Sequence, residues 1–319
     1  MDNGDKDLEL EPFFAYELCA VPSALIDEQS CLRKGNKSVL VKRLGVVELS
    51  AKPADTIIIN VSQLFYHIVW PHGGSPSNMI ASIQTQLSRY PCDSKKVVAF
   101  DKYRDVSTKD HERMRRAGEA IADYELSITS TLPKRDVIMK RKQNKRDLAS
   151  VLSTFSRGEN ITIETADDDI YGRDEANITM ICYFLEASSS GEDVIRVLSD
   201  GTDVFVLLVY WVFRAQLRCK VQMERWNGTI LDINATCMEL GPKCPQLLGM
   251  HVLSGCDSTS YLYGKGKISA RNTLLSGNYP GLSEIVGEVG TTHEQLMEAT
   301  TLFFISLYGQ PQGTSMESV

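Results

Sequence analysis

The chain has 319 residues, of which 43% are hydrophobic and 24% charged, and its formal net charge is −7. These values are typical of a globular protein and argue against a disordered chain or a uniformly basic nucleic-acid binder, although a local basic surface stays compatible with them. The longest apolar stretch, residues 204–213, is too short to span a bilayer. Eight scattered cysteines predict reduced thiols in an intracellular protein, nuclear or cytoplasmic.

The first fifty residues are expected to form an N-terminal extension with short elements of its own and no catalytic pattern. From residue 56 onward, strands and helices alternate. The continuous apolar runs at 57–59 and 97–100 predict buried strands at 57–59 and 96–100, and the spacing within 77–90 predicts a helix. A long polar helix is expected over residues 108–124.

The second half of the chain continues the alternation after a basic segment at residues 134–146. Asp203 is expected to cap a buried helix that begins at Val204. The dipeptide Asn227-Gly228 joins two apolar runs and predicts a β-hairpin. The remaining predicted elements are a helix at 148–155, a strand at 161–163, a helix at 174–187, a strand at 194–198 and a helix at 245–253.

This alternation predicts an α/β fold with a mostly parallel sheet flanked by helices and a small hairpin insertion at 218–233. Three regions are expected along the chain. They are an extension at 1–50, the α/β domain at 51–280, and a helical, partly disordered tail at 281–319.

Several of the apolar runs end in a polar or acidic residue. Asn60 follows the first run, Asp101 the second, Asp200 and Asp203 the run at 194–198, and Asp257 follows a helix. Side chains just beyond parallel strands lie at the edge of the sheet where ligands bind, and converging carboxylates suit a hard metal ion. Taken singly, residues 200–203 favour an ordinary turn and residues 255–257 a helix C-cap over a ligand site.

In their order and spacing, these segments resemble the PIN-like nucleases, and most of all the flap endonuclease group. The resemblance covers residues 56–275 and does not account for the first fifty. The pattern FDxYxxxSxKDxxRxRR at 100–116 and the segment GCDSTS at 255–260 also resemble uncharacterised, multicopy, mobile-element-like animal proteins. The fold implied is a PIN-like, Rossmann-like sheet with a helical arch at 102–146.

The resemblance implies a mechanism in which carboxylates hold divalent ions, Mg²⁺ or Mn²⁺, that activate water and stabilise the leaving oxygen of a phosphodiester. The chain keeps four of the seven acids that the family has, so a single ion or none is as compatible with the sequence as two. The retained positions are Asp101, Glu175, Asp203 and Asp257, and the degenerate positions are Asn60, Asn177 and Gly201. Asp200, one residue before Gly201, is a possible substitute ligand.

Residues 102–146 carry thirteen Lys/Arg against seven Asp/Glu, in the part of the chain where the resemblance places the arch. A basic run is often only a solvated face, but this placement favours contact with DNA or RNA. The expected contact residues are Lys109, Arg113, Arg116, Lys140, Arg141, Lys142, Lys145, Gly264, Lys265, Gly266 and Lys267. Two hypotheses follow. The protein is a metal-dependent nuclease with a partly degenerate site, or it is an inactive nucleic-acid-binding or protein-interaction module derived from such a nuclease.

Overall fold

The computed structural model describes residues 23–28, 31–100, 124–155, 160–164, 175–257, 259–284 and 288–310. The chain divides into two compact units. One is formed by residues 41–244, and the other by residues 1–40 together with 245–319. The regions predicted from the sequence have different bounds and stay a prediction.

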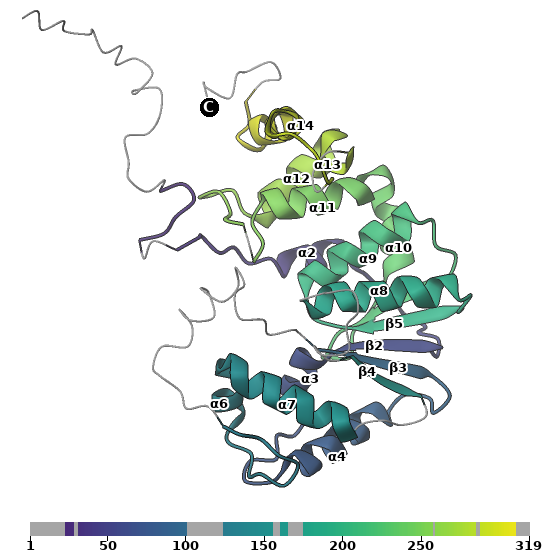
Figure 1. Ribbon diagram of the computed structural model, residues 1–319. Coiled ribbons are helices and arrows are strands. Elements are labelled where there is room, and N and C mark those ends of the chain that lie inside the picture. Colours follow the sequence, from purple (N-terminus) through teal and green to yellow (C-terminus); the bar gives the residue numbers. More distant parts are fainter. Residues whose placement is uncertain are drawn as a thin grey trace, which may run out of the picture. The chain divides into compact units, whose positions relative to one another are not determined.

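The first unit is built on a seven-stranded sheet with the order β1-β7-β6-β5-β2-β3-β4 (Figure 1). The five strands from β6 to β4 in that order are parallel. β7 is antiparallel to β6, and β1 is antiparallel to β7. The predicted α/β class with a mostly parallel sheet is therefore confirmed. The strands are β1 (Val46–Val47), β2 (Thr56–Asn60), β3 (Lys95–Ala99), β4 (Ile161–Glu164), β5 (Val194–Leu198), β6 (Lys220–Glu224) and β7 (Ile230–Asp232).

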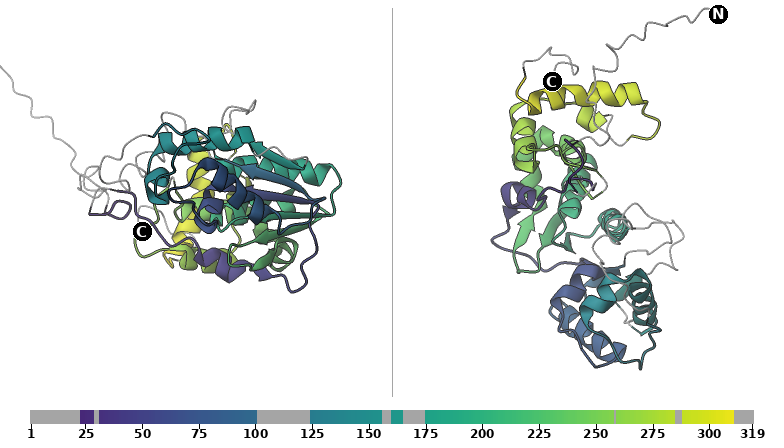
Figure 2. Two further views of the ribbon diagram at one scale, coloured as in Figure 1. Left: turned by 90° about the horizontal axis from the view of Figure 1, so that it is seen from below. Right: turned by 90° about the vertical axis from the view of Figure 1, so that its left-hand side faces the viewer.

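Helices cover both faces of this sheet (Figure 1; Figure 2). Ile57, Ile59 and Val98 pack against one helical layer, and every one of these side chains is buried. Because alternate residues of a strand point to opposite faces, Ile58 and Val97 face the other layer. The first layer consists of α3 (Val61–His67), α4 (Pro76–Leu87), α6 (Arg135–Lys140) and α7 (Lys142–Phe155). The second consists of α8 (Ala176–Ser189), α9 (Thr202–Arg214) and α10 (Ile233–Leu240).

The predicted hairpin is formed by β6 and β7, with Gly228 at φ 83 in the turn. Two-residue hairpin turns require a positive φ, and the glycine of an Asn-Gly pair adopts it without steric strain. β1 was not predicted, and it brings residues 46–47 of the N-terminal extension onto the edge of the sheet. The long helix expected at 108–124 falls almost wholly outside the described residues.

The second unit is helical. It contains most of α11 (Cys244–Leu253), and α12 (Lys267–Ser276), α13 (Gly281–Glu284) and α14 (His293–Leu307). The ring of Tyr279 meets Phe303 edge-on with centroids 5.3 Å apart, and Leu274 and Leu282 of the same unit are also buried. α2 (Val39–Leu44) and η2 (Gly241–Lys243) lie near the boundaries between the units along the chain. Within the described ranges, no helix has both the length and the hydropathy needed to cross a membrane.

Candidate functional site

The carboxyl ends of β2 and β5 mark the point at which the strand order reverses. From β2 the chain proceeds outward through β3 and β4, and it then returns to β5, on the other side of β2, and continues to β6. Open α/β sheets bind their ligands in the crevice at such a point. Asn60 is the last residue of β2, and residues 199–201 follow β5. The structure thus brings two of the predicted site segments to one edge.

Asn60 has a structural role at this edge. Its side chain is 6% exposed, and its Oδ1 accepts a hydrogen bond from the backbone N–H of Gln63 at 3.3 Å, which caps the N-terminus of α3. Aspartate is as good an N-cap as asparagine. The cap therefore gives no reason for asparagine to replace a carboxylate here.

Gly201, and not Asp203, precedes the first residue of α9, and Asp203 lies in the first turn. The expectation that Asp203 caps this helix was wrong, because the helix begins at Thr202, two residues before the expected start at Val204. Gly201 has φ −68 and ψ 124, a conformation open to any residue. A Cβ at Gly201 would lie 3.2 Å from the Oγ of Ser199 and 3.7 Å from Nε2 of Gln63, which is tight but free of backbone obstruction.

Asp200 is contacted by side chains of two neighbouring segments, α3 and the turn between β6 and β7. Its Oδ1 lies 3.1 Å from Nε of Arg225, and its Oδ2 lies 4.0 Å from Nε2 of His67. Its backbone N–H donates to Oε1 of Gln63 at 2.6 Å, and the same oxygen accepts from the indole N–H of Trp226 at 3.3 Å. The rings of His67 and Trp226 stack with centroids 4.6 Å apart. The carboxylate is thus already neutralised by its own chain.

Gln63, His67, Arg225 and Trp226 were not predicted from the sequence. They come from α3 and from the turn between β6 and β7, and they meet Asp200 because strand order brings these segments together. The predicted turn at Asn227-Gly228 indicated only that Arg225 and Trp226 lie in or next to a hairpin. No sequence pattern connected that hairpin with α3.

Glu175 and Asn177 lie at the start of α8. Glu175 is the residue before the helix and makes no side-chain cap bond there, while its backbone oxygen accepts from the N–H groups of Ile178 and Thr179 at 3.0 and 3.2 Å. Four other predicted site residues lie outside the described residues. They are Asp101, Lys109, Arg113 and Arg116.

Asp257 belongs to the second unit, in a loop after α11. Its Oδ1 lies 2.9 Å from Nζ of Lys37, and its backbone oxygen accepts from Nζ of Lys34 at 2.9 Å. The loop turns at Gly255, whose φ of 95 and close approach to Tyr261 leave no room for a side chain. Here too, a predicted metal ligand is paired with a cation of the chain.

The described residues do not fit a two-metal centre. Among them, no group of three or more His, Cys, Asp or Glu side chains is close enough together to hold an ion. At the β2/β5 edge the available oxygens belong to Asn60, which caps α3, to Asp200, which pairs with Arg225, and to Asp203. Mg²⁺ is bound mainly by carboxylates and water, and this edge offers few of the former.

The basic residues at 140–145 lie at the junction between two helices. α6 ends at Lys140, and α7 begins at Lys142. Lys140 is exposed, whereas Arg141 is half-buried. Just before them, the guanidinium of Arg135 lies 5.1 Å from the ring centroid of Tyr66 and donates to the backbone oxygen of Tyr66 at 3.1 Å. This contact at the first residue of α6 therefore joins the start of the basic segment to α3.

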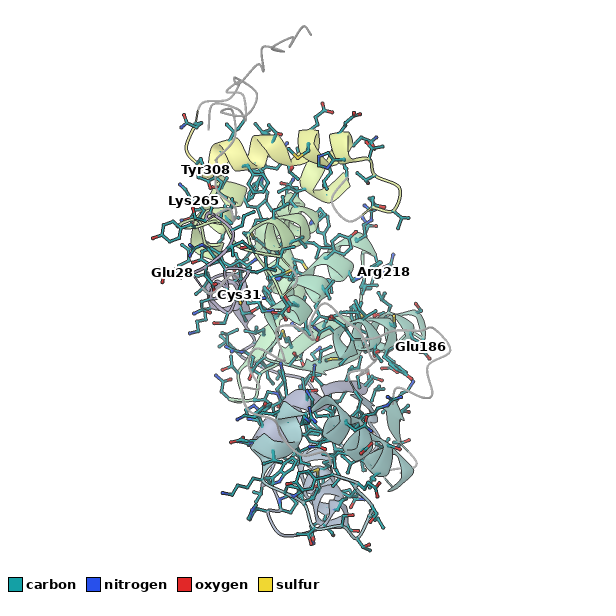
Figure 3. All side chains as sticks on the ribbon, turned by 60° about the vertical axis from the view of Figure 1, so that its left-hand side comes forward. Glu28, Cys31, Glu186, Arg218, Lys265 and Tyr308 are labelled. Atoms are coloured by element: carbon teal, nitrogen blue, oxygen red, sulfur yellow. The ribbon has the colours of Figure 1, made fainter. Side chains whose placement is uncertain are left out.

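The predicted contacts at 264–267 divide into exposed and buried positions. Gly264 is exposed and Lys265 is half-buried, with the ammonium of Lys265 5.1 Å from the ring centroid of Tyr308 (Figure 3). Lys267 is only 3% exposed, and its Nζ donates to the backbone oxygen of His251 and, at 3.0 Å, to Oγ of Ser254. This placement does not agree with a role for Lys267 in contacting nucleic acid.

Two further polar features of the first unit are internally satisfied. A cavity of about 350 Å³ beside β5 is lined in part by Tyr90, Arg196 and Glu224, and Glu224 accepts from both of the others at 3.0 and 3.2 Å. Burial, followed by the charge of Glu224, raises the pKa of Tyr90 and keeps its hydroxyl protonated. The three side chains therefore form a hydrogen-bonded network centred on Glu224, and Lys52 and Arg89 also line the cavity.

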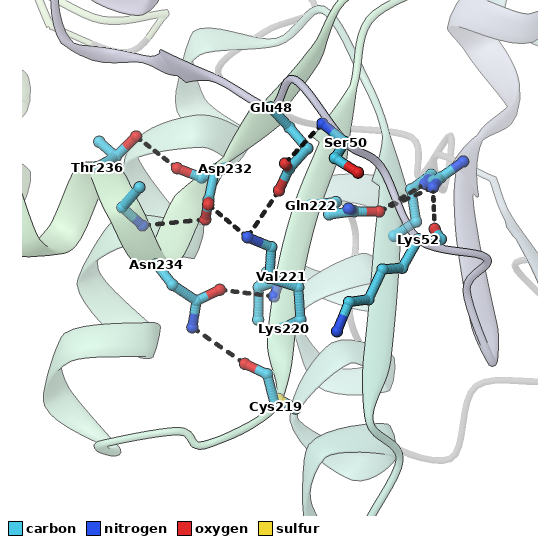
Figure 4. Close-up of polar contacts among 12 residues, drawn as sticks. Glu48, Ser50, Lys52, Cys219, Lys220, Val221, Gln222, Asp232, Asn234 and Thr236 are labelled. Carbon is cyan, nitrogen blue, oxygen red and sulfur yellow. Dashed lines mark hydrogen bonds and ion pairs between the residues drawn. The ribbon is translucent and has the colours of Figure 1, made fainter.

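The antiparallel edge is joined by a second network (Figure 4). The ammonium of Lys220 on β6 contacts Oε2 of Glu48 at 2.7 Å and the carboxylate of Asp232. Burial acts to lower the pKa of Lys220, but its hydrogen bonds to Asp232 and Glu48 outweigh burial and raise it. The hydrogen bond from Lys220 also lowers the pKa of Glu48. Asp232 caps α10 by accepting from the N–H of Ala235 at 3.0 Å.

No family model matches the chain, and no curated protein matches it. Among solved structures, T5 5'-exonuclease with bound zinc is similar over 79% of this chain and 88% of its own, with 15% identity and a TM-score of 0.46. The catalytic core of Rad2 with a DNA substrate is similar over 75% and 66%, with 17% identity and a TM-score of 0.43. A second Rad2 complex with DNA covers 88% and 87%, with 16% identity and a TM-score of 0.43. Similarities of this size say nothing about activity.

Proposed function

We propose that the protein binds structured or single-stranded nucleic acid through a basic surface and that its phosphodiester cleavage is weak or lost. The binding half of the proposal rests on residues 134–147, which carry seven Lys/Arg against two Asp/Glu in a chain of net charge −7. Ile138 and Leu148 face the core, whereas Lys134, Lys140 and Arg146 are exposed. Cations arranged in this way bind phosphates without reading sequence.

The observation that carries the loss of cleavage is the ion pair between Asp200 and Arg225. Where the resemblance expects an acid, the chain has Gly201, and the neighbouring acid that could substitute is paired with an arginine. Asn60 and Asn177 each lack a further negative charge at expected ligand positions. Two-metal chemistry requires several carboxylates held in close register, and this chain lacks a carboxylate at three of the seven expected positions.

A weakened nuclease is the second candidate, because Asp203 remains at the start of α9 beside the strand-order reversal. Together with Asp101, Glu175 and Asp257, it completes the four retained acids. If this candidate is correct, the ion is Mg²⁺ or Mn²⁺, because the remaining ligands are oxygen donors. The partner is DNA or RNA under both candidates.

One experiment separates these functions. Fluorescently labelled single-stranded and flap DNA, and single-stranded RNA, are titrated with the purified full chain, and the same samples are tested for cleavage with Mg²⁺ and Mn²⁺. We expect binding that weakens with salt, because counterions are released from the phosphates. The variant Lys140→Ala/Arg146→Ala should bind more weakly. The variant Lys42→Ala/Arg43→Ala removes two other exposed cations and serves as the matched control.

Cleavage that disappears in Asp203→Ala would replace the proposal with the weakened nuclease. Binding that is equally strong in Lys140→Ala/Arg146→Ala and in the control would show that the α6–α7 junction is not the binding surface. If no nucleic acid binds at low salt, the proposed function fails.

A further inference from the structure

The resemblance leaves residues 1–50 without a role, but the structure fixes part of this segment. Residues 23–28 and 31–38 form what we call the N-terminal strap, which folds back on itself through the bridge between Ile26 and Leu32. The N–H of Asp27 donates to the oxygen of Cys31 at 2.9 Å, and the N–H of Cys31 donates to Oδ1 of Asp27 at 2.9 Å. The two described parts of the strap are therefore joined to each other by a bridge and two hydrogen bonds.

The strap is attached to the loop at 255–263 in the same unit. The N–H of Tyr263 donates to the oxygen of Ala24 at 3.0 Å, and the N–H of Tyr261 donates to the oxygen of Arg33 at 3.3 Å. The N–H of Arg33 donates to Oγ of Ser260 at 3.1 Å. These main-chain bonds join two segments more than 200 residues apart into one surface.

The strap places three cations on that surface, and each is held by a contact of its own. The guanidinium of Arg33 lies 4.7 Å from the ring centroid of Tyr263, and its Nε donates to the oxygen of Ser23 at 2.9 Å. Lys34 is exposed and donates to the backbone oxygen of Asp257. Lys37 pairs with the Asp257 carboxylate and cancels its charge. The carboxylate of Asp27 is occupied by the N–H of Cys31.

Apart from the Lys37–Asp257 pair, this surface has a net charge of +1 and lies beside an aromatic side chain, with the cations Arg33, Lys34 and Lys265 and the acids Asp27 and Glu28. Tyr263 is 67% exposed, and Lys265 follows it by two residues. Figure 3 shows Lys265 on the same side of this unit as Cys31 and Glu28 of the strap. Glu28 is exposed and opposes the cations in part. A guanidinium stacked on a ring loses little entropy when its free edge binds a phosphate, and an exposed tyrosine can stack on a base.

We propose that the N-terminal strap, through Arg33 and Lys34 beside Tyr263, is a second contact surface for the nucleic-acid backbone. This inference rests on the proposed function, since it assumes that nucleic acid is the partner. It adds residues that the resemblance does not cover. The surface binds phosphates of either DNA or RNA, because none of its groups reads a base edge.

The test measures the salt dependence of binding of labelled single-stranded DNA to the full chain. Each phosphate contact contributes about 0.7 to the slope of log K against log salt for a single strand. Arg33→Ala/Lys34→Ala should therefore lower the slope by about 1.4, with at least a tenfold loss of affinity at low salt. Arg33→Lys/Lys34→Arg keeps both charges and should retain most of the slope. Glu28→Gln removes the opposing charge and should tighten binding.

The control is Lys42→Ala/Arg43→Ala, which removes two exposed cations outside the strap. Equal slopes for the wild type and Arg33→Ala/Lys34→Ala would overturn the strap inference while leaving the proposed function intact. A slope reduced equally by the control variant would also overturn it, since the effect would then be one of net charge. Failure of the wild type to bind would instead overturn the proposed function. Thermal unfolding of each variant confirms that the strap surface is still folded.

Discussion

Oδ1 of Asp200 lies 3.1 Å from Nε of Arg225, so the residue that was expected to replace a lost metal ligand is paired with a guanidinium. The side chains are 37% and 22% exposed, and a pair of this kind contributes at most about 1 kcal/mol. The pair therefore matters less for the stability of the fold than for the chemistry of the site. It links the loop after β5 to the β6–β7 turn and removes a free carboxylate from the edge of the sheet.

Restoring the lost acids should increase divalent-ion binding. Asn60→Asp keeps the cap of α3, and Gly201→Asp uses a backbone conformation that aspartate adopts without strain. We expect Asn60→Asp/Gly201→Asp to bind Mn²⁺ at least tenfold more tightly than the wild type, measured by calorimetry. Asn60→Asp/Gly201→Asn adds a similar volume at position 201 with one charge fewer and should gain less. Unchanged Mn²⁺ affinity in both variants would show that position 201 does not face a metal pocket.

Gln63 should stabilise the edge more than the ion pair does. Its Oε1 accepts from the N–H of Asp200 at 2.6 Å and from Nε1 of Trp226 at 3.3 Å. Removing the acceptor leaves two partly buried donors unpaired, so Gln63→Ala should lower the free energy of unfolding by about 1–3 kcal/mol. Urea unfolding followed by tryptophan fluorescence measures this loss. Gln63→Glu keeps an acceptor oxygen and should lose less, and equal losses for the two variants would contradict the role of Oε1.

The central strands of the sheet were predictable because burial on both faces requires mostly apolar runs, continuous at 57–59 and interrupted only by Arg196 at 194–198. The hairpin was predictable from Asn227-Gly228. β1 was not, because a strand of two residues has no period to detect. The contacts of Asp200 were also beyond prediction, since they depend on strand order and not on local pattern. The same holds for Lys37 and Asp257, which lie 220 residues apart and meet through the strap.

Acid should weaken the antiparallel edge through Glu48. Its hydrogen bond from Lys220 lowers its pKa in the folded state below the ordinary value of 4.5. A depressed pKa means that the stabilisation is complete above pH 4.5 and is lost as the pH falls through the folded value. The free energy of unfolding of the wild type should therefore fall more steeply below that pH than that of Glu48→Gln. Parallel pH profiles for the two proteins would contradict this, and Glu192→Gln is a comparison at another half-buried glutamate.

Gly255 should be irreplaceable in the loop that carries Asp257 and receives the strap. Its φ is 95, and a Cβ there would lie 2.6 Å from Cβ of Tyr261 and 2.7 Å from the backbone nitrogen of Tyr261. Gly264 has a similar φ of 71 but no heavy atom within 4 Å of such a Cβ.

Gly264→Ala should therefore cost only the backbone strain of about 1 kcal/mol, whereas Gly255→Ala adds a clash with main-chain atoms and should cost about 3 kcal/mol or more. Differential scanning calorimetry compares the two directly. Because Tyr261 donates to the oxygen of Arg33, the clash in Gly255→Ala should also release the strap. Faster proteolysis near residue 33 in Gly255→Ala than in Gly264→Ala would be the expected sign. Equal melting temperatures for the two variants would mean that the loop yields to the added methyl group, and Tyr261 would then not be fixed by its contact with Gly255.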